Sequence, residues 1–300
     1  MDRDLLSHLP VLVRVAKHRS FVGAAAALNM SASAVSHAVK VVEDKLGEPL
    51  FARTTRSVSL TEAGTSLLSK VDAALEDIEN ALERISARRG EVTGLLRVNC
   101  SRVAFSMALT GVLARLASEH PRLTVEVHTN DALVDIVAEG FDAGIRLGEA
   151  VQQDMVAVRL TQPFKAILVA SPAYLHARGT PTKLAELGAH NCIGFRLLAS
   201  GSVYDWDLVE EGRNVAVRTS GTVVITDATL ARELALAGVG IAYIFEPLVR
   251  DALRQGSLKR LLPETALTES GLFLYFPRRA SMSAKLRAFI DVARQTLAVP

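Results

Sequence analysis

The stretch SFVGAAAALNMSASAVSHAVKVVEDKL, residues 20–46, decides how the first part of this chain folds. In its first half Phe21, Ala25 and Leu28 recur at i, i+4 and i+7, so they share one face of a helix. Asn29 then suits the end of that helix, because its short polar side chain tolerates a left-handed backbone. The stretch therefore predicts a helix, a very tight turn and a second helix.

The second helix is predicted to have an apolar side and a polar side. Ser31 can accept a hydrogen bond from its free N–H groups, and Gly47 can end it. Its apolar stripe consists of Val35, Ala38, Val39, Val42 and Leu46. The other side of its first turns carries Ser33, Ser36, His37 and Lys40. These polar residues include no carboxylate, which fits a DNA major groove, and the pair of helices predicts a helix-turn-helix. The alternative is a small αα-hairpin with a solvated polar face.

Length and charge restrict what the whole chain can be. A chain of 300 residues suggests two or three domains, and 49% hydrophobic residues suffice for real cores. The formal net charge is +2, from 34 basic and 32 acidic residues. Nucleic-acid binding would therefore require a local patch rather than a globally basic chain.

The first residues and the cysteines indicate a compartment. The beginning, MDRDLLSHLPVLVRV, mixes charges and lacks a long apolar run, so we do not expect a signal peptide. No apolar stretch approaches the roughly 20 residues that a membrane helix needs. Cys100 and Cys192 stand far apart and fit a reducing cytosol, and no His/Cys pair has the spacing of metal ligands. We expect a cytoplasmic protein without membrane contact, metal or cofactor.

Elements on both sides complete a winged version of the motif. Residues 4–17 predict a helix beneath the pair, although Pro10 can kink this helix or delay its start. Residues 50–60 predict two short strands joined by a basic tip. Arg53 and Arg56 of this hairpin can reach a phosphate or the adjacent minor groove, unless the turn is simply solvated.

A long helix is predicted after the hairpin, because Thr61 followed by Glu62 is a helix-start signal. The apolar residues then alternate spacings of three and four, as in a coiled-coil seam: Leu68, Val71, Leu75, Ile78, Leu82 and Ile85. A narrow stripe on a long helix needs a partner. We interpret residues 61–89 as a dimerising linker helix; the alternative is packing against its own domain.

From Gly94 strands alternate with helices, which predicts parallel sheets with crossover helices. In the first unit we expect strands at 95–100, 123–129 and 143–147 and helices at 102–118 and 131–139. In the second we expect strands at 164–171, 192–196, 216–220 and 240–245 and helices near 182–187 and at 228–237, then a strand at 272–277 and a helix at 281–297. Two such units suggest two lobes with a ligand cleft between them.

The run SFVGAAAALNMSASAVSHAVKVVEDKLGEPLFARTTRSVSLTEAG closely resembles the N-terminal winged helix-turn-helix of LysR-type transcriptional regulators. The segments EGFDAGIRLG (139–148) and LALAGVGIAYI (234–244) are similar to recurring segments of that family's effector domain. The resemblance covers essentially the whole chain. It implies a winged helix-turn-helix at 1–60, the linker helix at 61–89, and a two-lobed, periplasmic-binding-protein-like α/β effector domain at 90–300.

The resemblance also implies how the chain is assembled and used. The chain would cross between lobes twice, which gives lobe I as 94–163 plus 267–300 and lobe II as 164–266. Members of the family are homo-oligomers, dimers or often tetramers, that bind double-stranded DNA and respond to a small-molecule effector.

The family's DNA-binding residues can be carried over by position. They are Ser31, Ala32, Ser33, Ser36, His37 and Lys40 in the major groove, and Arg53 and Arg56 in the wing. Many members have Gln where this chain has Ala32, and Arg is common where it has His37. Alanine can only touch a thymine methyl, so the half-site preference of relatives does not transfer.

Family placement and the position of residues at strand ends together mark an effector cleft. The candidates are Cys100, Ser101, Thr129, Asn130, Arg146, Phe195, Arg196, Thr226 and Asp227. The hypothesis is a small polar or carboxylated effector held by Ser101, Thr129 and Thr226. Arg196 or Arg146 would supply the counter-charge, unless each forms an ion pair at the surface or between the lobes.

An enzyme and a solute-binding protein are the rival classes. The chain has no Gly-x-Ser-x-Gly elbow, no His-Glu-x-x-His and no P-loop, and Gly238-x-Gly240 falls in the wrong order for a dinucleotide fingerprint. A solute-binding protein would fit the two lobes but not the DNA-binding head. Cys100 is either a redox sensor or, in the simpler interpretation, a small buried residue.

Overall fold

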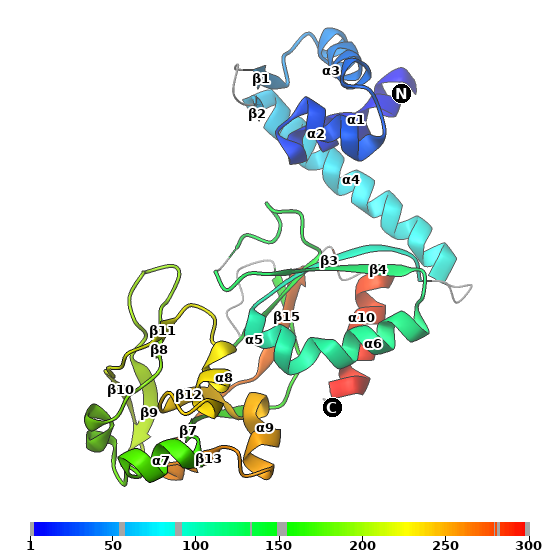
Figure 1. Ribbon diagram of the computed structural model, residues 1–300. Helices are drawn as coiled ribbons and strands as arrows, with labels where there is room; N and C mark the ends of the chain where they lie inside the picture. The colour runs from blue at the N-terminus through cyan, green and yellow to red at the C-terminus, as the bar shows by residue number, and fades with distance from the viewer. Residues whose placement is uncertain are drawn as a thin grey trace. The chain divides into compact units, whose positions relative to one another are not determined.

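The computed structural model divides the chain into two compact units, Met1–Glu91 and Val92–Pro300 (Figure 1). The long helix predicted at 61–89 falls in the first unit. The residues that the structure describes are 3–53, 58–87, 92–132, 134–148, 155–278, 280 and 283–297. None of the helices within these ranges combines the length and the apolar character that crossing a bilayer requires.

The first unit is a helical head with a small hairpin. Its elements are α1 (Arg3–His18), α2 (Phe21–Leu28), α3 (Ala32–Leu46), β1 (Phe51–Arg53), β2 (Val58–Leu60) and α4 (Glu62–Ala87). The two strands pair antiparallel, as the sequence predicts. Pro10 lies inside α1, so it does not delay the start of that helix.

The tight turn between α2 and α3 has the predicted chemistry. Asn29 ends α2 in the left-handed region, with a φ of 52°. The Ser31 hydroxyl accepts a hydrogen bond from the backbone N–H of Ala34 at 3.1 Å, which caps α3. Gly47 ends α3 with a φ of 72°, a conformation that glycine adopts at little cost.

One hydrophobic core holds the head together and fixes the orientation of α3. The residues of the predicted stripe that are buried in this core are Val35, Ala38, Val39 and Val42. Leu46 was assigned to the same stripe, but it is 43% exposed because α3 ends there. Burial of an aliphatic side chain contributes about 1.5–3 kcal/mol, so this stripe determines which face of α3 meets solvent.

The N-terminus of helix α4 is attached to the head by hydrogen bonds of Thr61. The Thr61 hydroxyl accepts a hydrogen bond from the Gly64 N–H at 3.0 Å and donates one to the Pro49 carbonyl at 2.7 Å. Gly64 allows this approach, since a Cβ there would lie 2.1 Å from the carbonyl oxygen of Leu50. The first turn of α4 therefore follows the head rigidly.

The predicted seam of α4 divides into two halves. Leu68 is buried in the core of the head, and Val71 and Leu75 pack against that core. This first half matches the alternative of packing within its own domain. In the second half three residues are exposed: Ile78 by 57%, Leu82 by 60% and Ile85 by 58%. The helix thus ends with an apolar stripe facing solvent.

Lobe I of the second unit is built on a mixed sheet in the order β4-β3-β5-β15-β6. Its strands are β3 (Gly94–Cys100), β4 (Leu123–Thr129), β5 (Ala143–Leu147), β6 (Met155–Arg159) and β15 (Leu272–Pro277). The first three are parallel, and β15 is antiparallel to β5 and β6. The helices that share its core are α5 (Arg102–Ala104), a π-helical segment (Phe105–Leu109), α6 (Thr110–Glu119) and α10 (Ala284–Leu297).

Lobe II is organised around β7 (Phe164–Ala170). The strands that pair antiparallel with it are β12 (Ala242–Phe245), β13 (Lys259–Leu261) and β14 (Leu267–Glu269). Two smaller sheets complete the strands: the parallel pair β8 (Gly194–Phe195) and β11 (Val224–Ile225), and the hairpin β9 (Trp206–Glu210) and β10 (Arg213–Val217). The helices are α7 (Pro172–Arg178), α8 (Leu230–Leu236) and α9 (Glu246–Arg254), with 3-10 turns at Leu184–Ala189 and Pro263–Thr265.

The structure differs from the sequence predictions for the second unit in several places. The described residues of the predicted helix at 131–139 form bends at 131–132 and a single turn from 136 rather than a helix. The Asp135 carboxylate accepts hydrogen bonds from the N–H groups of Val137 and Ala138, and Gly140 follows with a φ of 72°. The sheet around β7 is antiparallel rather than parallel, since β12, β13 and β14 all run opposite to β7. Residues 267–269, assigned to lobe I, belong to lobe II as β14.

Candidate nucleic-acid interface and inter-lobe pocket

The polar side of α3 is exposed, opposite its buried stripe. The exposed residues are Ser31, Ala32, Ser33, His37 and Lys40, and Ser36 is partly buried. Besides capping the helix, the Ser31 hydroxyl lies 2.9 Å from that of Ser33. Residues 31–41 contain no carboxylate, so this face offers small donors and cations to whatever it meets.

The hairpin is tied to α3 by Glu43, a residue that was not among the sequence predictions. A carboxylate oxygen of Glu43 accepts hydrogen bonds from the N–H groups of Leu50, at 2.8 Å, and Phe51, at 3.1 Å. This contact sets the start of β1 against α3. The side chain of Arg53 and all of Arg56, predicted to act in the wing, lie outside the described residues.

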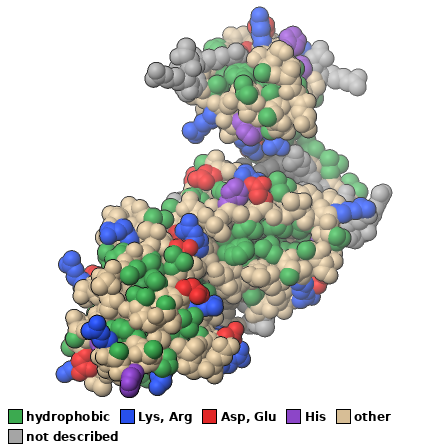
Figure 2. Space-filling view, viewed as in Figure 1, with side chains coloured by type: hydrophobic (Ala, Val, Ile, Leu, Met, Phe, Trp, Pro, Cys, Tyr) green, Lys and Arg blue, Asp and Glu red, His purple; other side chains and the backbone are tan. Residues whose placement is uncertain are grey.

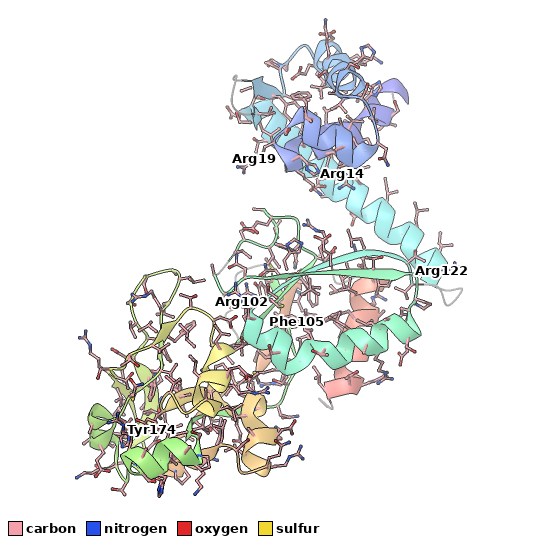
Figure 3. All side chains as sticks on the ribbon, in the orientation of Figure 1. Arg14, Arg19, Arg102, Phe105, Arg122 and Tyr174 are labelled. Carbon is pink, nitrogen blue, oxygen red and sulfur yellow. The ribbon has the colours of Figure 1, made fainter. Side chains whose placement is uncertain are left out.

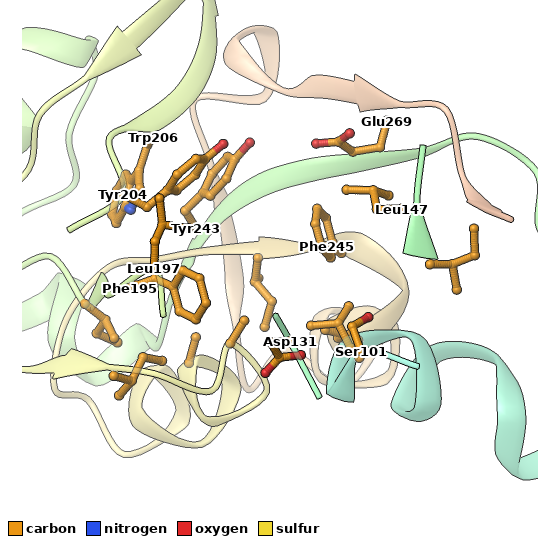
Figure 4. Close-up of a pocket in the computed structure, with 18 residues that line it drawn as sticks. Ser101, Asp131, Leu147, Phe195, Leu197, Tyr204, Trp206, Tyr243, Phe245 and Glu269 are labelled. Carbon is orange, nitrogen blue, oxygen red and sulfur yellow. The ribbon is translucent and has the colours of Figure 1, made fainter. Parts of the chain in front are cut away.

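A cavity of about 320 Å³ lies between the two lobes of the second unit (Figure 4). Lobe I contributes Ser101, Val103, Asp131, Leu147 and Leu272 to its lining. Lobe II contributes the aromatic residues Phe195, Tyr204, Trp206, Tyr243 and Phe245, together with Glu269 and several aliphatic residues. The volume is at the small end of the range for ligand sites, roughly 300–1,000 Å³.

The structure brings only part of the predicted effector set to this cavity. Ser101 and Phe195 line it. Thr129 and Thr226 are exposed and are absent from the lining. Arg196 is also exposed, and its guanidinium donates a hydrogen bond to the Gly201 carbonyl at 2.6 Å. The three predicted ligand-holding hydroxyls are therefore not assembled around one cavity.

Arg146 is buried and hydrogen-bonded within lobe I, so it has a structural role. It is 9% exposed, and its guanidinium donates to the carbonyls of Ile145, Asn130 and Ala132 at 2.8, 3.0 and 3.1 Å. A further bond goes to the side-chain oxygen of Asn99. Arg146 thus holds together the chain segments at the ends of β3, β4 and β5. It does not line the cavity.

Cys100 ends β3 as a fully buried residue. Burial raises the pKa of its thiol to about 11, which outweighs the opposite effect of the nearby Arg146 charge. Cys192 in lobe II is buried as well, and burial likewise raises its pKa to about 11. Both thiols are protonated at neutral pH, which favours the simpler interpretation of Cys100 over a redox sensor.

Arg102 bridges the two lobes at the edge of the cavity. Its side chain lies 2.7 Å from a carboxylate oxygen of Asp131 in lobe I and 3.6 Å from one of Asp227 in lobe II. Its backbone N–H also donates to Asp131 at 2.9 Å. Figure 3 places Arg102 at the start of α5, and Figure 2 shows basic and acidic side chains together near the border of the lobes. Asp227, predicted to hold an effector, is therefore part of an ion-pair bridge.

The opposite end of the cavity is acidic and aromatic. The Tyr204 hydroxyl donates to a carboxylate oxygen of Asp207, and the Tyr243 hydroxyl donates to the Asp207 carbonyl at 2.8 Å. Glu269 faces the same end in Figure 4. Burial, and secondarily the charge of Asp207, raise the pKa of Glu269 above its ordinary value. Burial is also the main cause that raises the pKa of both tyrosines.

A winged helix-turn-helix head on a long helix, followed by a two-lobed α/β domain, defines a class of DNA-binding transcriptional regulators. The family model "LysR substrate binding domain" matches residues 89–298, and "Bacterial regulatory helix-turn-helix protein, lysR family" matches residues 6–65. The chain belongs to the LysR-type transcriptional regulators.

Individual relatives agree with this assignment. The chain is 36% identical over 289 residues to the HTH-type transcriptional regulator YcaN of Escherichia coli, covering 96% of this chain and 94% of that one. It is 35% identical over 291 residues to the regulator PgrR of the same organism, covering 97% of each. The structure of CrgA, a LysR-type regulator from Neisseria meningitidis, matches with a TM-score of 0.63 and 28% identity over 97% of this chain and 98% of that one. The relatives are regulators, so this chain is a regulator and not an enzyme.

Proposed function

We propose that this regulator binds a promoter site as a homo-oligomer and responds to a small molecule held between the lobes of its second unit. The observation that carries the proposal is the exposed, carboxylate-free face of α3 opposite a fully buried stripe. We assign a DNA-binding head to residues 1–60, a linker helix to 61–89 and an effector domain to 90–300. Acting on a promoter, it would work in the cytoplasm.

In the head, α3 would enter the major groove. The residues proposed to face the DNA are Ser31, Ala32, Ser33, Ser36, His37 and Lys40, with Arg53 and Arg56 at the wing. Serines and His37 can hydrogen-bond base edges or phosphates, Ala32 can touch a thymine methyl, and Lys40 suits a phosphate. Glu43 supports this arrangement indirectly, because its bonds to Leu50 and Phe51 hold the hairpin against α3.

Pairing of heads would use the second half of α4. Ile78, Leu82 and Ile85 follow one another at spacings of four and three and are more than half exposed. An exposed apolar stripe of this kind is stabilised by a second copy of the same helix. Two heads held together would read two half-sites, which a single small head cannot do.

In the effector domain, the cavity at Ser101 and Phe195 is the proposed effector site. The first lobe would comprise residues 94–163 and those after Glu269, and the second residues 164–269, since β14 pairs with β7. Arg102 binds an aspartate from each lobe, so occupancy of the cavity beside it would change how the lobes are held. Such a change would shift the population of oligomer arrangements and hence DNA binding.

The test is a fluorescence-anisotropy titration of the full chain against a labelled duplex from the region upstream of its own gene. We expect saturable binding at low salt that weakens steeply as salt rises, because phosphate contacts release counterions. Light scattering of the same sample should give the mass of a dimer or a tetramer. A monomer, or no preference over a scrambled duplex, would refute the proposal.

A further inference from the structure

We propose that the cavity between the lobes takes an organic cation, a small ammonium-bearing molecule with an apolar body, rather than the carboxylate expected from the sequence. The inference rests on the proposed function, since it names the class of ligand for the same site. It is carried by the charges, rings and apolar surfaces that the cavity presents together.

The charged groups of the lining are all acidic. Asp131 and Glu269 line the cavity, and within the described part of the chain no lysine, arginine or histidine does so. Asp131 is already paired with Arg102 at 2.7 Å. Among the described residues none forms an ion pair with Glu269, so its negative charge is the one available to a ligand.

Aromatic rings stand beside that carboxylate. Trp206 and Tyr243 are stacked with ring centroids 5.8 Å apart, and Tyr204 lies 6.3 Å from Tyr243. In Figure 4 the carboxylate of Glu269 points toward the hydroxyl ends of the two tyrosines. Aromatic faces attract cations through their quadrupole, and the attraction grows when water is excluded. A carboxylate next to such rings is the combination that recognises an ammonium group.

The surroundings of Glu269 make a positive ligand more favourable still. Burial and the charge of Asp207 both raise the pKa of Glu269, which means that its ionised form is disfavoured in the empty site. A cation within contact distance would offset both effects. An anionic ligand would add a further like charge. The two arginines predicted to balance the charge of an anionic ligand do not line the cavity. Arg146 is hydrogen-bonded to backbone carbonyls, and Arg196 is hydrogen-bonded to the carbonyl of Gly201.

The rest of the cavity suits an apolar body. Phe245 and Leu147 lie between the Glu269 end and the Ser101 end in Figure 4, and Leu197 also lines the cavity. A ligand that reaches across the cavity would bury its hydrocarbon part against these side chains. Its ammonium group would lie at Glu269, and a second polar group could meet the Ser101 hydroxyl.

The chain contains a single tryptophan, Trp206, and it lines the cavity. Its emission therefore reports occupancy directly. The probes are benzylammonium, benzyl alcohol and benzoate, which share a ring and differ in the charge of one head group. We expect benzylammonium to change the emission saturably and to bind at least about tenfold more tightly than benzyl alcohol, with benzoate weakest.

Three variants locate the effect. Glu269→Gln keeps the shape of the side chain and removes its charge, so the affinity for benzylammonium should fall to that for benzyl alcohol. Glu264→Gln changes an exposed residue of the same segment and should leave all three affinities unchanged. Asp207→Asn, which removes negative charge without touching the ligand, should give a smaller decrease. It also serves as the second test if Glu269→Gln does not fold.

Three results would overturn the inference: equal or tighter binding of benzoate or benzyl alcohol, no saturable response to benzylammonium, or an unchanged preference in Glu269→Gln. The titration contains no DNA, so its failure is separate from a failure of the proposed function. A wild-type protein that prefers benzoate yet still binds its upstream duplex would remain a ligand-responsive regulator with a different class of ligand.

Discussion

The exposed face of α3 and the cavity between the lobes have opposite electrostatic character. The exposed face of α3 carries hydroxyls, His37 and Lys40 and contains no carboxylate through residue 41. The cavity between the lobes carries carboxylates and aromatic rings, and within the described residues no cation lines it. A nearly neutral chain thus separates its charges locally, cationic where we propose a polyanion binds and acidic where we propose a cation binds.

The largest effect is expected from breaking the proposed pairing of heads, on which DNA binding would depend and ligand binding in the cavity would not. Ile78→Asp places a charge in the exposed stripe of α4. Loss of the dimer should lower affinity for the upstream duplex about 100-fold or more, because two linked heads bind far better than one. Light scattering and anisotropy measure both consequences.

Leu198→Asp is the matched control for that variant, since Leu198 is also an exposed aliphatic residue but lies in lobe II. It should keep the oligomer mass and the DNA affinity of wild type. Benzylammonium binding should be unaffected in Ile78→Asp. Retention of full DNA affinity by a monomeric Ile78→Asp would contradict the proposed role of the stripe.

A smaller effect is expected from Lys40→Ala, which weakens the cationic surface itself. Loss of one phosphate contact should reduce DNA affinity about equally for specific and scrambled duplexes and lower the slope of log K against log salt by about 1. Lys183→Ala removes the same charge from an exposed site in lobe II and should change neither quantity. An unchanged slope in Lys40→Ala would assign Lys40 to bases or to solvent.

Arg102→Met examines how the acidic cavity is linked to the rest of the protein. The Arg102 side chain is 40% exposed, so its ion pairs should contribute at most about 1 kcal/mol to the free energy of unfolding. The expected change is instead in the coupling between ligand binding in the cavity and DNA binding. Saturating benzylammonium should alter DNA affinity less in Arg102→Met than in wild type. Equal coupling in both proteins would exclude the bridge from that role.

The smallest effect is expected from thiol reagents. Burial raises the pKa of Cys100 and Cys192 to about 11, so both remain thiols rather than thiolates across pH 6–8. A chromogenic disulfide reagent should therefore react slowly with the folded protein and quickly after unfolding. Fast reaction of folded protein, with loss of DNA binding, would indicate a redox-sensing cysteine instead.

The head was predictable to the level of single residues because its structure is set by local contacts. The spacing of Val35, Ala38 and Val39, the left-handed Asn29 and the cap at Ser31 all act within a few residues of chain. The seam of α4 was predicted as a continuous stripe. The division of this stripe into a buried half and an exposed half was not predicted, because burial of Leu68 depends on core residues of the head that are distant in sequence.

The cavity was predictable in location but not in composition. Ser101 and Phe195 follow from their positions at the ends of strands, and both line the cavity. Trp206, Tyr243 and Glu269 come from three strands whose meeting depends on long-range pairing, with β12 and β14 both bonded to β7. Residue type alone also favoured Arg146 as a ligand, whereas the fold uses it to bind backbone carbonyls.

The most direct test of this difference in charge is to reverse the charge of the cavity with the substitution Glu269→Lys. Trp206 emission, titrated with benzylammonium and with benzoate, gives the ratio of the two affinities in wild type and in Glu269→Lys. We predict a ratio that favours benzylammonium in wild type and benzoate in the variant, with DNA affinity in the absence of probe unchanged. A folded Glu269→Lys protein with the wild-type ratio would show that the carboxylate does not select the ligand.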